Sequence, residues 1–595
     1  LHGHKAFLDQ RDQRIRVAGP DEFVGRRRKV QEILADFEHK THAGIVVHAA
    51  GRQGKSSLAA RIVHRMKAHE IVVLHGRYDV GTLLQRLERA TGHPEVIAAR
   101  RDLTAAADPD ENELYLRLRA LLEGPCGERV EGAAGAPARR PVLVIVDDFE
   151  QGLDLLPGGK CRIKAELFPS MRALVRAFAD AETESRLLFT SRQMFPIGTP
   201  DDPVSRSLLD LALPPMEPFE SMKQAAAKAR TRKDGAAAVT QNRLHRIVEN
   251  AKGIPGLQDL LFTLTLSNPD AGERALDEVR RYMADGSEPS QEALREFIEN
   301  LTLRALYDLL NPGAKTLLRA GNLFTLPVPR AVVEAIGEDL GAGTGALDRL
   351  LDLGLVDRYD EPGDDGPTSV LVNPLVRGIT GTLGSEEEKS LARVAAPLLH
   401  EIWGGDGPCS RRTPAAHEVS RLALLAESHE IIADVGENAV RWLASMAEHR
   451  TATKTGQQIV ALLDTAGIPP APYLLVAVGD QCAMTGEVKA ARTFLERAVA
   501  VLENAQDIGE PVDVEDLAAA LLSLGRRIVN EGDPDGALEL FQKAQRVMEE
   551  DRFIRERAIV LGDIARILVS KGKVDEAMNL HKEELETYEQ LGDTR

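Results

Sequence analysis

The sequence predicts a multidomain α/β plus α fold, with a parallel sheet near the N-terminus and helices in the rest of the chain. Three observations support this prediction. Apolar runs alternate with helical patterns in the first third, aromatic residues make up only 4% of the chain, and helix-turn-helix repeats occur near its end. We divide the 595 residues into the segments 1–22, 23–216, 217–300, 301–385, 386–470 and 471–595.

The first segment, 1–22, is polar and rich in arginine, and it shows no apolar periodicity. Such a composition is typical of a linker between domains. The chain begins with Leu1, and its last residues, 591–595, match the start of another repeat turn. We therefore expect the sequence to be a segment of a longer chain, with an upstream domain before the linker and a truncated repeat array.

An apolar run, Ile45–Val47, opens the α/β pattern of segment 23–216 and leads into a loop that ends in Gly-Lys-Ser-Ser. Backbone N–H groups of such a loop, with the positive end of the helix that follows, bind phosphate oxygens. Ala49 stands where the pattern usually has glycine, and its methyl group is small enough to be tolerated. The alternative is a glycine turn before an ordinary helix. The predicted phosphate-binding residues are Gly51, Gly54, Lys55, Ser56 and Ser57.

An unbroken apolar run, Pro141–Val146, ends in the acids Asp147 and Asp148, as a strand buried on both faces does. We expect Ser56 and Asp147 to hold Mg²⁺. Asp148 or Glu150 is expected to orient or deprotonate the attacking water. The alternative is that the aspartate pair caps a helix.

Two further apolar runs complete the α/β pattern. The run Leu187–Thr190 ends in Ser191–Arg192, which places a hydroxyl and a cation where a γ-phosphate sensor lies. The run Ile71–Leu74 is followed by a helical pattern. Strands that alternate with helices predict a parallel sheet, whose ligands bind at the carboxyl ends of the strands. The predicted catalytic residues are Lys55, Asp147, Asp148 and Arg192.

Charge and cysteine content exclude several classes of protein. The formal net charge is −18, which argues against coating of duplex DNA, because neutralising phosphates needs dense Lys and Arg. The four cysteines are scattered, so neither a disulfide framework nor a zinc site is expected. No apolar run approaches the ~18 residues of a membrane span. We expect a cytoplasmic protein without a membrane partner.

The motif Phe23–Arg28 precedes the phosphate loop and leads into an amphipathic helix. Read alone, its three successive arginines form a solvated face. Together with the phosphate loop, the acidic strand and the Ser-Arg pair, the motif resembles that of the signal-transduction ATPases with numerous domains (STAND), which include the NB-ARC and NACHT proteins. The resemblance implies an ATP/ADP site with Mg²⁺, in which Val24 packs on the adenine and Gly25 and Arg26 bond to it or to nearby phosphates.

A second match lies in segment 217–300, which reads as a helical subdomain. Lys252–Leu257 resembles the Gly-x-Pro motif of the family, and the resemblance implies that Pro255 closes over the nucleotide. The alternative is an ordinary helix start, because proline is favoured in the first turn of a helix.

Segment 301–385 reads as three helices followed by a hairpin with its tip at 361–366, which predicts a winged helix. Its recognition helix carries Asp348 and Asp352 and few cations, so contact with DNA bases is not expected. In the family, a histidine of this module contacts the diphosphate and stabilises the ADP state. Asn373 stands at that position here and cannot carry the charge, so the presence of this ADP lock is left open.

The C-terminal part is predicted to be an α-solenoid. Segment 386–470 carries no motif and is expected to be a helical bridge. In segment 471–595, turns at Gly486, Gly532 and Gly572 are each followed by small residues, and the last two units are about forty residues apart. This pattern resembles a long-period tetratricopeptide repeat, in which each unit buries its face on the next and the surface binds a protein or peptide. The alternative is a plain helical bundle.

The motifs and the resemblance together predict a signal-transduction switch. In it, ADP holds the modules closed, and a ligand on the repeats favours an open ATP state. The resemblance also implies slow ATP hydrolysis, nucleotide-dependent homo-oligomerisation and a fused or associated effector domain, as in bacterial defence proteins of this class.

Two alternatives belong to other classes of protein. A P-loop motor or remodelling ATPase would turn over ATP rapidly. A tetratricopeptide scaffold would keep a degenerate site that does not hydrolyse the nucleotide. Degeneracy is disfavoured by the intact Lys55, Ser56, Asp147 and Asp148. Ala49 and Asn373 favour it. A transcriptional regulator is disfavoured by the acidic winged helix.

Overall fold

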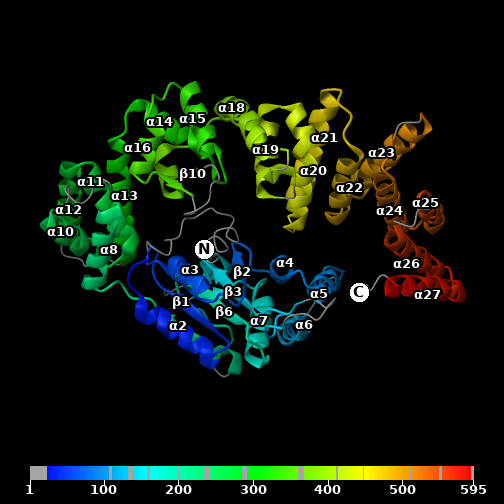
Figure 1. Ribbon diagram of the computed structural model, residues 1–595, viewed down its shortest axis with the longest axis horizontal. Coiled ribbons are helices and arrows are strands. Elements are labelled where there is room, and N and C mark those ends of the chain that lie inside the picture. The colour runs from blue at the N-terminus through cyan, green and yellow to red at the C-terminus, as the bar shows by residue number, and fades with distance from the viewer. Residues whose placement is uncertain are drawn as a thin grey trace. The chain divides into compact units, whose positions relative to one another are not determined.

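The computed structural model describes residues 23–105, 110–130, 138–156, 161–198, 202–231, 240–284, 291–359, 368–405, 407–410, 413–446, 448–508, 511–548 and 553–590. The chain forms two compact units, Leu1–Leu383 and Gly384–Arg595 (Figure 1). Three predicted features lie outside the described residues: the linker 1–22, the hairpin tip 361–366 and the last turn 591–595.

A five-stranded parallel sheet lies in the first unit, with the strand order β2-β3-β6-β1-β7. The predicted parallel sheet is therefore confirmed, and its four predicted strands are β1, β2, β3 and β6. The edge strand β7 was not predicted, because the exposed Asp210 interrupts its apolar pattern. The strands are β1 (Gly44–His48), β2 (Glu70–His75), β3 (Val142–Asp147), β6 (Arg186–Ser191) and β7 (Leu208–Ala212).

Helices cover both faces of this sheet, which explains why its strands are apolar without alternation. Successive side chains such as Ile45 and Val46 enter different cores. One core includes side chains of α2 (Arg27–His39) and α3 (Lys55–Arg65). The other includes side chains of α4 (Val80–Thr91), α5 (Pro94–Ala105), α6 (Glu111–Glu123) and α7 (Phe168–Asp180).

Short elements connect β3 to the rest of the sheet. After β3 the chain forms a single 3₁₀ turn and an antiparallel pair of short strands. A second 3₁₀ turn precedes β7. These elements are η1 (Phe149–Gly152), β4 (Leu153–Leu155), β5 (Cys161–Ile163) and η2 (Pro203–Arg206).

Among the described residues after the sheet, five helices form what we call the helical group. Leu261 and Ile298 belong to its apolar core, which is separate from the two cores of the sheet. The helices are α8 (Pro218–Thr231), α10 (Gln241–Ala251), α11 (Pro255–Ser267), α12 (Pro269–Ala284) and α13 (Gln291–Asp308).

A small antiparallel sheet, with the order β8-β10-β9, follows the helical group. The strands β9 and β10 pair as the predicted hairpin, with Val372 opposite Val356. The elements are α14 (Pro312–Ala320), η3 (Gly321–Leu323), β8 (Val328–Pro329), α15 (Arg330–Asp339), α16 (Ala346–Asp352), β9 (Val356–Arg358), β10 (Ser369–Val372), η4 (Pro374–Val376) and α17 (Arg377–Thr380).

The described part of the second unit is helical throughout. Its last six helices form the predicted helix-turn-helix pairs, and Gly486, Gly532 and Gly572 each have a positive φ at the turn within a pair. The elements are α18 (Ser385–Trp403), η5 (Pro408–Ser410), α19 (Pro414–Ala426), α20 (His429–Ser445), α21 (His449–Thr465), α22 (Pro472–Met484), α23 (Val488–Asp507), α24 (Val514–Asn530), α25 (Pro534–Val547), α26 (Ile554–Ser570) and α27 (Val574–Gln590).

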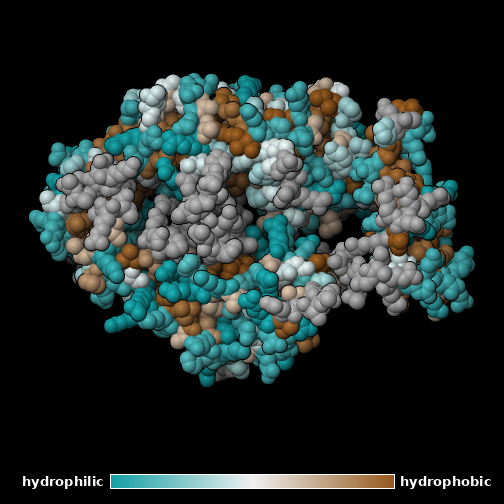
Figure 2. All heavy atoms as spheres, in the orientation of Figure 1, coloured by the Kyte–Doolittle hydropathy of each residue, from teal (hydrophilic) through white to brown (hydrophobic). Residues whose placement is uncertain are grey.

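Hydrophilic residues cover most of the face shown in Figure 2, with apolar residues scattered between them. Among the described helices, none combines the length and the apolar character needed to cross a membrane.

Packing between paired helices of the second unit depends on small residues. A Cβ atom built on Gly525 of α24 would lie 2.5 Å from the Phe541 ring of α25. We expect Gly525→Val to lower the free energy of unfolding of this unit by about 1–3 kcal/mol, because the extra carbons overpack the contact. Urea unfolding measures the change. Ala519→Val, at an exposed position of the same helix, is the control, and equal losses in both variants would contradict this explanation.

Candidate functional site

The predicted phosphate loop joins β1 to α3 and has the backbone of an anion-binding turn. Arg52 and Gly54 have φ values of 63° and 84°, in the left-handed region. The helix α3 begins directly after Gly54, without a side chain that caps its first N–H groups. These N–H groups are the donors that bind a phosphate at a helix N-terminus. Ser57 is half-buried in the first turn of α3.

The side chain of Lys55 folds back across this loop. Its Nζ donates hydrogen bonds to the backbone oxygens of Ala49 at 3.0 Å and Ala50 at 3.4 Å. Burial lowers the pKa of the Lys55 ammonium, and the nearby carboxylates of Glu150 and Asp148 oppose this shift. Lys55 is therefore a buried cation at the edge of the sheet where the acidic strand ends.

Ser56 and Asp147 meet, as the sequence predicts for a pair that holds a cation. The Ser56 hydroxyl donates to Asp147 Oδ1 at 3.1 Å, and the Thr190 hydroxyl donates to the same oxygen at 2.6 Å. The N–H of Asp148 donates to Thr190 Oγ1 at 2.9 Å. Asp147 and Thr190 are fully buried. The sequence did not single out Thr190, because its role depends on β6 being the neighbour of β3 in the sheet.

Tyr78 fixes the backbone at the end of β3. Its hydroxyl donates to the carbonyl oxygens of Asp147 at 3.0 Å and Asp148 at 2.8 Å. Burial raises the pKa of the Tyr78 hydroxyl, so it remains a donor at neutral pH. Its ring packs edge-on against Phe149, with 5.0 Å between the ring centroids. Asp148 has a φ of 53°, and these contacts hold the turn that aims its side chain.

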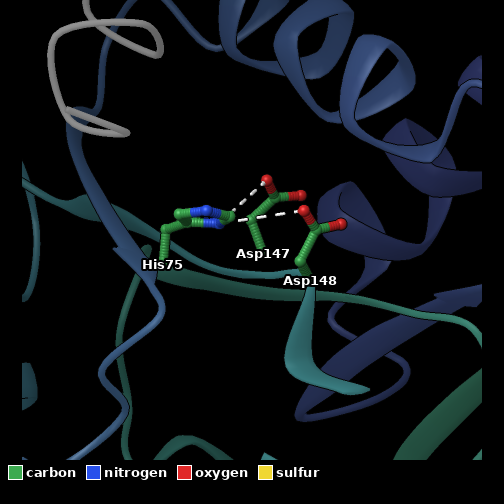
Figure 3. Close-up of side chains that lie close together, drawn as sticks. All are labelled: His75, Asp147 and Asp148. Atoms are coloured by element: carbon green, nitrogen blue, oxygen red, sulfur yellow. Dashed lines mark ion pairs between the residues drawn. The ribbon is translucent and has the colours of Figure 1, made fainter. Parts of the chain in front are cut away.

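His75, the last residue of β2, lies beside both aspartates (Figure 3). Its Nδ1 is 3.8 Å from Asp147 Oδ2 and 3.9 Å from Asp148 Oδ2. His75 was not predicted from the sequence. The only signal was its place directly after the apolar run Ile71–Leu74, and the strand order then brings it opposite Asp147 in register.

Arg192 follows β6 at the same edge of the sheet. Its Nε pairs with Glu150 Oε1 at 3.0 Å, and about half of its side chain, 51%, is exposed. The positive charge of Arg192 also contributes to lowering the pKa of Lys55, because two nearby positive charges repel each other.

Arg26 connects the motif after residue 22 to the phosphate loop. It is buried, and its Nη2 donates to the backbone and side-chain oxygens of Gln53, each at 3.4 Å. Its Nη1 donates to the carbonyl of Pro214, and its N–H donates to Glu220 of α8 at 2.9 Å. Burial lowers the pKa of the Arg26 guanidinium. Val24 and Gly25, at its side, are half-buried.

Pro255 is the first residue of α11, and the start of this helix touches the phosphate loop. The N–H of Gly256 donates to the carbonyl of Arg52 at 3.3 Å. A Cβ atom built on Gly256 would lie 2.9 Å from the Cβ of Arg52, so this close approach needs glycine. The Gly-x-Pro motif therefore lies against the loop that the sequence predicts to bind phosphate.

A largely buried ion pair joins Arg52 of the phosphate loop to α13. Arg52 donates from Nε and Nη2 to the two carboxylate oxygens of Glu299, at 3.1 and 3.2 Å. Arg295 donates to Glu299 at 2.8 Å, and its side chain lies 3.3 Å from a Cβ built on Gly51. Burial lowers the pKa of the Arg52 guanidinium, and Glu299 opposes the shift. No sequence motif marked Glu299, which lies 247 residues from Arg52.

Asn373, which the sequence resemblance aligns with a diphosphate-binding histidine, follows β10. Its N–H donates to the carbonyl of Leu355 at 3.0 Å, and its own carbonyl accepts from the N–H of Val376 at 2.9 Å. Its backbone is therefore part of the turn after β10.

No protein-family model and no curated protein matches this sequence. Among solved structures, the chain is similar to a STAND protein with a tetratricopeptide repeat sensor from Pyrococcus horikoshii. The two are 14% identical, the match covers 98% of this chain and 79% of that chain, and the TM-score is 0.49.

Two other solved structures match parts of the chain. MamA is 21% identical over 30% of this chain and 89% of its own, with a TM-score of 0.24. A RuvB variant from Thermotoga maritima is 12% identical over 62% of this chain and 99% of its own, with a TM-score of 0.24. Residue roles in this chain therefore rest on the geometry described above.

Thr190 offers a test of how the acidic strand is held. We expect Thr190→Val to remove the hydroxyl bonds to Asp147 and to the Asp148 N–H, at a cost of about 1–3 kcal/mol in the free energy of unfolding. We also expect it to weaken Mg²⁺-dependent binding of a nucleotide about tenfold, as the loss of a group that orients a metal ligand does. Thermal unfolding with and without Mg-ADP measures both effects.

The matched control is Thr302→Val in α13. The Thr302 hydroxyl is also buried and donates to the carbonyl of Ile298 at 2.6 Å, within its own helix. It should lower stability without changing the shift caused by Mg-ADP. The same reduction of that shift in both variants would mean that Thr190 does not act through Asp147.

Proposed function

We propose that this chain is a nucleotide-dependent signal-transduction switch that binds ATP and ADP and hydrolyses ATP slowly. The observation that carries the proposal is the position of Arg52. This residue belongs to the phosphate loop, yet its backbone and side chain bond to two helices of the helical group. A ligand in the loop and the position of the helical group would therefore influence one another.

In the proposed site, the N-terminus of α3 and Lys55 bind the phosphates, and Ser56 and Asp147 would hold Mg²⁺. These two side chains fit Mg²⁺, because a hydroxyl and a carboxylate both supply the oxygen ligands that this ion accepts. The cation would neutralise negative charge on the phosphates. Asp148 or Glu150 would orient or deprotonate the water that attacks the γ-phosphorus, so that ADP and phosphate leave. Arg192, held by Glu150, would contact the γ-phosphate.

We further propose the roles of the other segments. Residues 23–216 form the nucleotide-binding domain, 217–300 the helical subdomain, 301–385 a winged helix, 386–470 a bridge and 471–595 the repeats. Val24 would pack on the base, and Gly25 and Arg26 would bond to it or to nearby phosphates. Pro255 would close over the nucleotide. The repeats would bind a protein or peptide, and the open state would form a homo-oligomer that activates a fused or associated effector. These roles follow the sequence resemblance. We also propose that the protein is cytoplasmic.

The closed state would depend on the pair of Arg52 and Glu299. Removing one partner of a buried ion pair leaves the other charge uncompensated, at a cost of about 3–5 kcal/mol. An activating ligand would have to supply comparable energy to move the helical group away from the loop, or give Arg52 another anion.

The nucleotide content of the purified chain tests the proposal directly. We expect bound ADP after denaturation, and slow ATP hydrolysis that is lost in Lys55→Ala and Asp147→Ala, since these remove the phosphate cation and the metal ligand. Lys29→Ala, an exchange outside the site, should leave turnover unchanged. Rapid turnover would instead support a motor, and the absence of both nucleotide and turnover would support a scaffold.

Glu299 tests the coupling to the helical group. We expect Glu299→Gln to release a fluorescent ADP analogue at least about tenfold faster in stopped-flow measurements, because the neutral amide no longer balances Arg52. Glu296→Gln, at an exposed position of the same helix, should release it at the wild-type rate. Equal rates in all three proteins would show that the ion pair does not retain the nucleotide.

A further inference from the structure

His75, Asp147 and Asp148 place three potential metal ligands at one point. The histidine comes from the end of β2 and the aspartates from the end of β3, and the side chains point toward one another in Figure 3. One ligand atom from each lies within 4.8 Å of the other two. Neighbouring strands fix this arrangement, because His75 and Asp147 are partners in the parallel register.

The separations are those of ion pairs when the imidazole is protonated, and they also fit ligands of one shared ion. The imidazole Nδ1 lies 3.8 and 3.9 Å from the two carboxylate oxygens, which is beyond hydrogen-bond distance. Two atoms that each lie ~2.1 Å from a shared cation are at most ~4.2 Å apart. The oxygen atoms that face His75 are both Oδ2, whereas Asp147 Oδ1 is occupied by the hydroxyls of Ser56 and Thr190.

The kinds of donor atom indicate the class of cation. Carboxylate oxygens alone suit Mg²⁺, Ca²⁺ and Mn²⁺, whereas an imidazole nitrogen suits the transition metals. One imidazole with two carboxylates therefore favours an ion that accepts both, such as Mn²⁺, over Mg²⁺. The rest of the predicted site offers only oxygen to a cation, through Ser56.

We infer that His75, Asp147 and Asp148 form a site for a divalent transition-metal ion, with His75 as the ligand that sets the preference for Mn²⁺ over Mg²⁺. The inference rests on the proposed function for the role of this ion beside a nucleotide. The binding of the metal itself needs only these three side chains and is measured without nucleotide.

The test is a titration of Mn²⁺ into the full chain, freed of nucleotide and metal, followed by the EPR signal of free Mn²⁺. We expect one tight site per chain that a tenfold excess of Mg²⁺ does not empty. Pulsed EPR of the bound ion should show coupling to a ¹⁴N nucleus, the signature of a ligating imidazole. Weak binding, complete displacement by Mg²⁺, or a bound ion without nitrogen coupling would overturn the inference.

Variants separate His75 from other histidines. His75→Gln should weaken Mn²⁺ binding at least about tenfold and remove the nitrogen coupling. His39→Gln, at an exposed histidine of α2, should leave both unchanged. Persistence of the coupling in His75→Gln would overturn the assignment, and if this variant does not fold, the coupling and Mg²⁺ competition in the wild type decide.

Binding of a fluorescent ADP analogue distinguishes the two proposals. If the analogue binds but Mn²⁺ shows no nitrogen coupling, the proposed nucleotide switch is supported and the assignment of His75 as a metal ligand is overturned. If Mn²⁺ binds with nitrogen coupling but no nucleotide binds, the metal site stands and the proposed function falls.

Discussion

The buried carboxylate of Asp147 is the group on which the candidate site depends. A carboxylate without contact to water is costly unless hydrogen bonds satisfy it. Here the hydroxyls of Ser56 and Thr190 do so, which ties the first turn of α3 and the strand β6 to the end of β3. Tyr78 fixes the backbone on the other side. The start of α3, the end of β3 and the strand β6 are therefore all anchored at this carboxylate.

Much of this site was predictable because its residues occur in contiguous patterns. Lys55 and Ser56 belong to one loop, and Asp147 ends an apolar run, so local sequence was enough to place them on a parallel sheet. Thr190, His75 and Glu299 could not be predicted in the same way. Their contacts depend on which strands are neighbours and on how distant helices pack. Local sequence periodicity determines neither of these.

In the second unit, too, local sequence predicts the turns but not the contacts between helices. Turn glycines mark the repeats, since a positive φ at a turn favours glycine. Segment 386–470 offered no motif, yet α21 is joined to α22 by polar contacts of His449 with Gln481, at 2.9 Å, and of Thr453 with Thr485, at 3.3 Å. Such pairs depend on two helix surfaces that meet, so the end of segment 386–470 packs directly on α22.

The double attachment of Arg52 has a consequence for how a signal would pass between the loop and the helices. Linkage requires that two events share one coupling free energy in both directions. If a bound phosphate adds a certain free energy to the contacts of Arg52 with Gly256 and Glu299, a displacement of α11 and α13 weakens the binding of phosphate by the same amount. The free energy by which the position of the helices changes phosphate affinity would therefore equal the free energy by which bound phosphate changes the position of the helices.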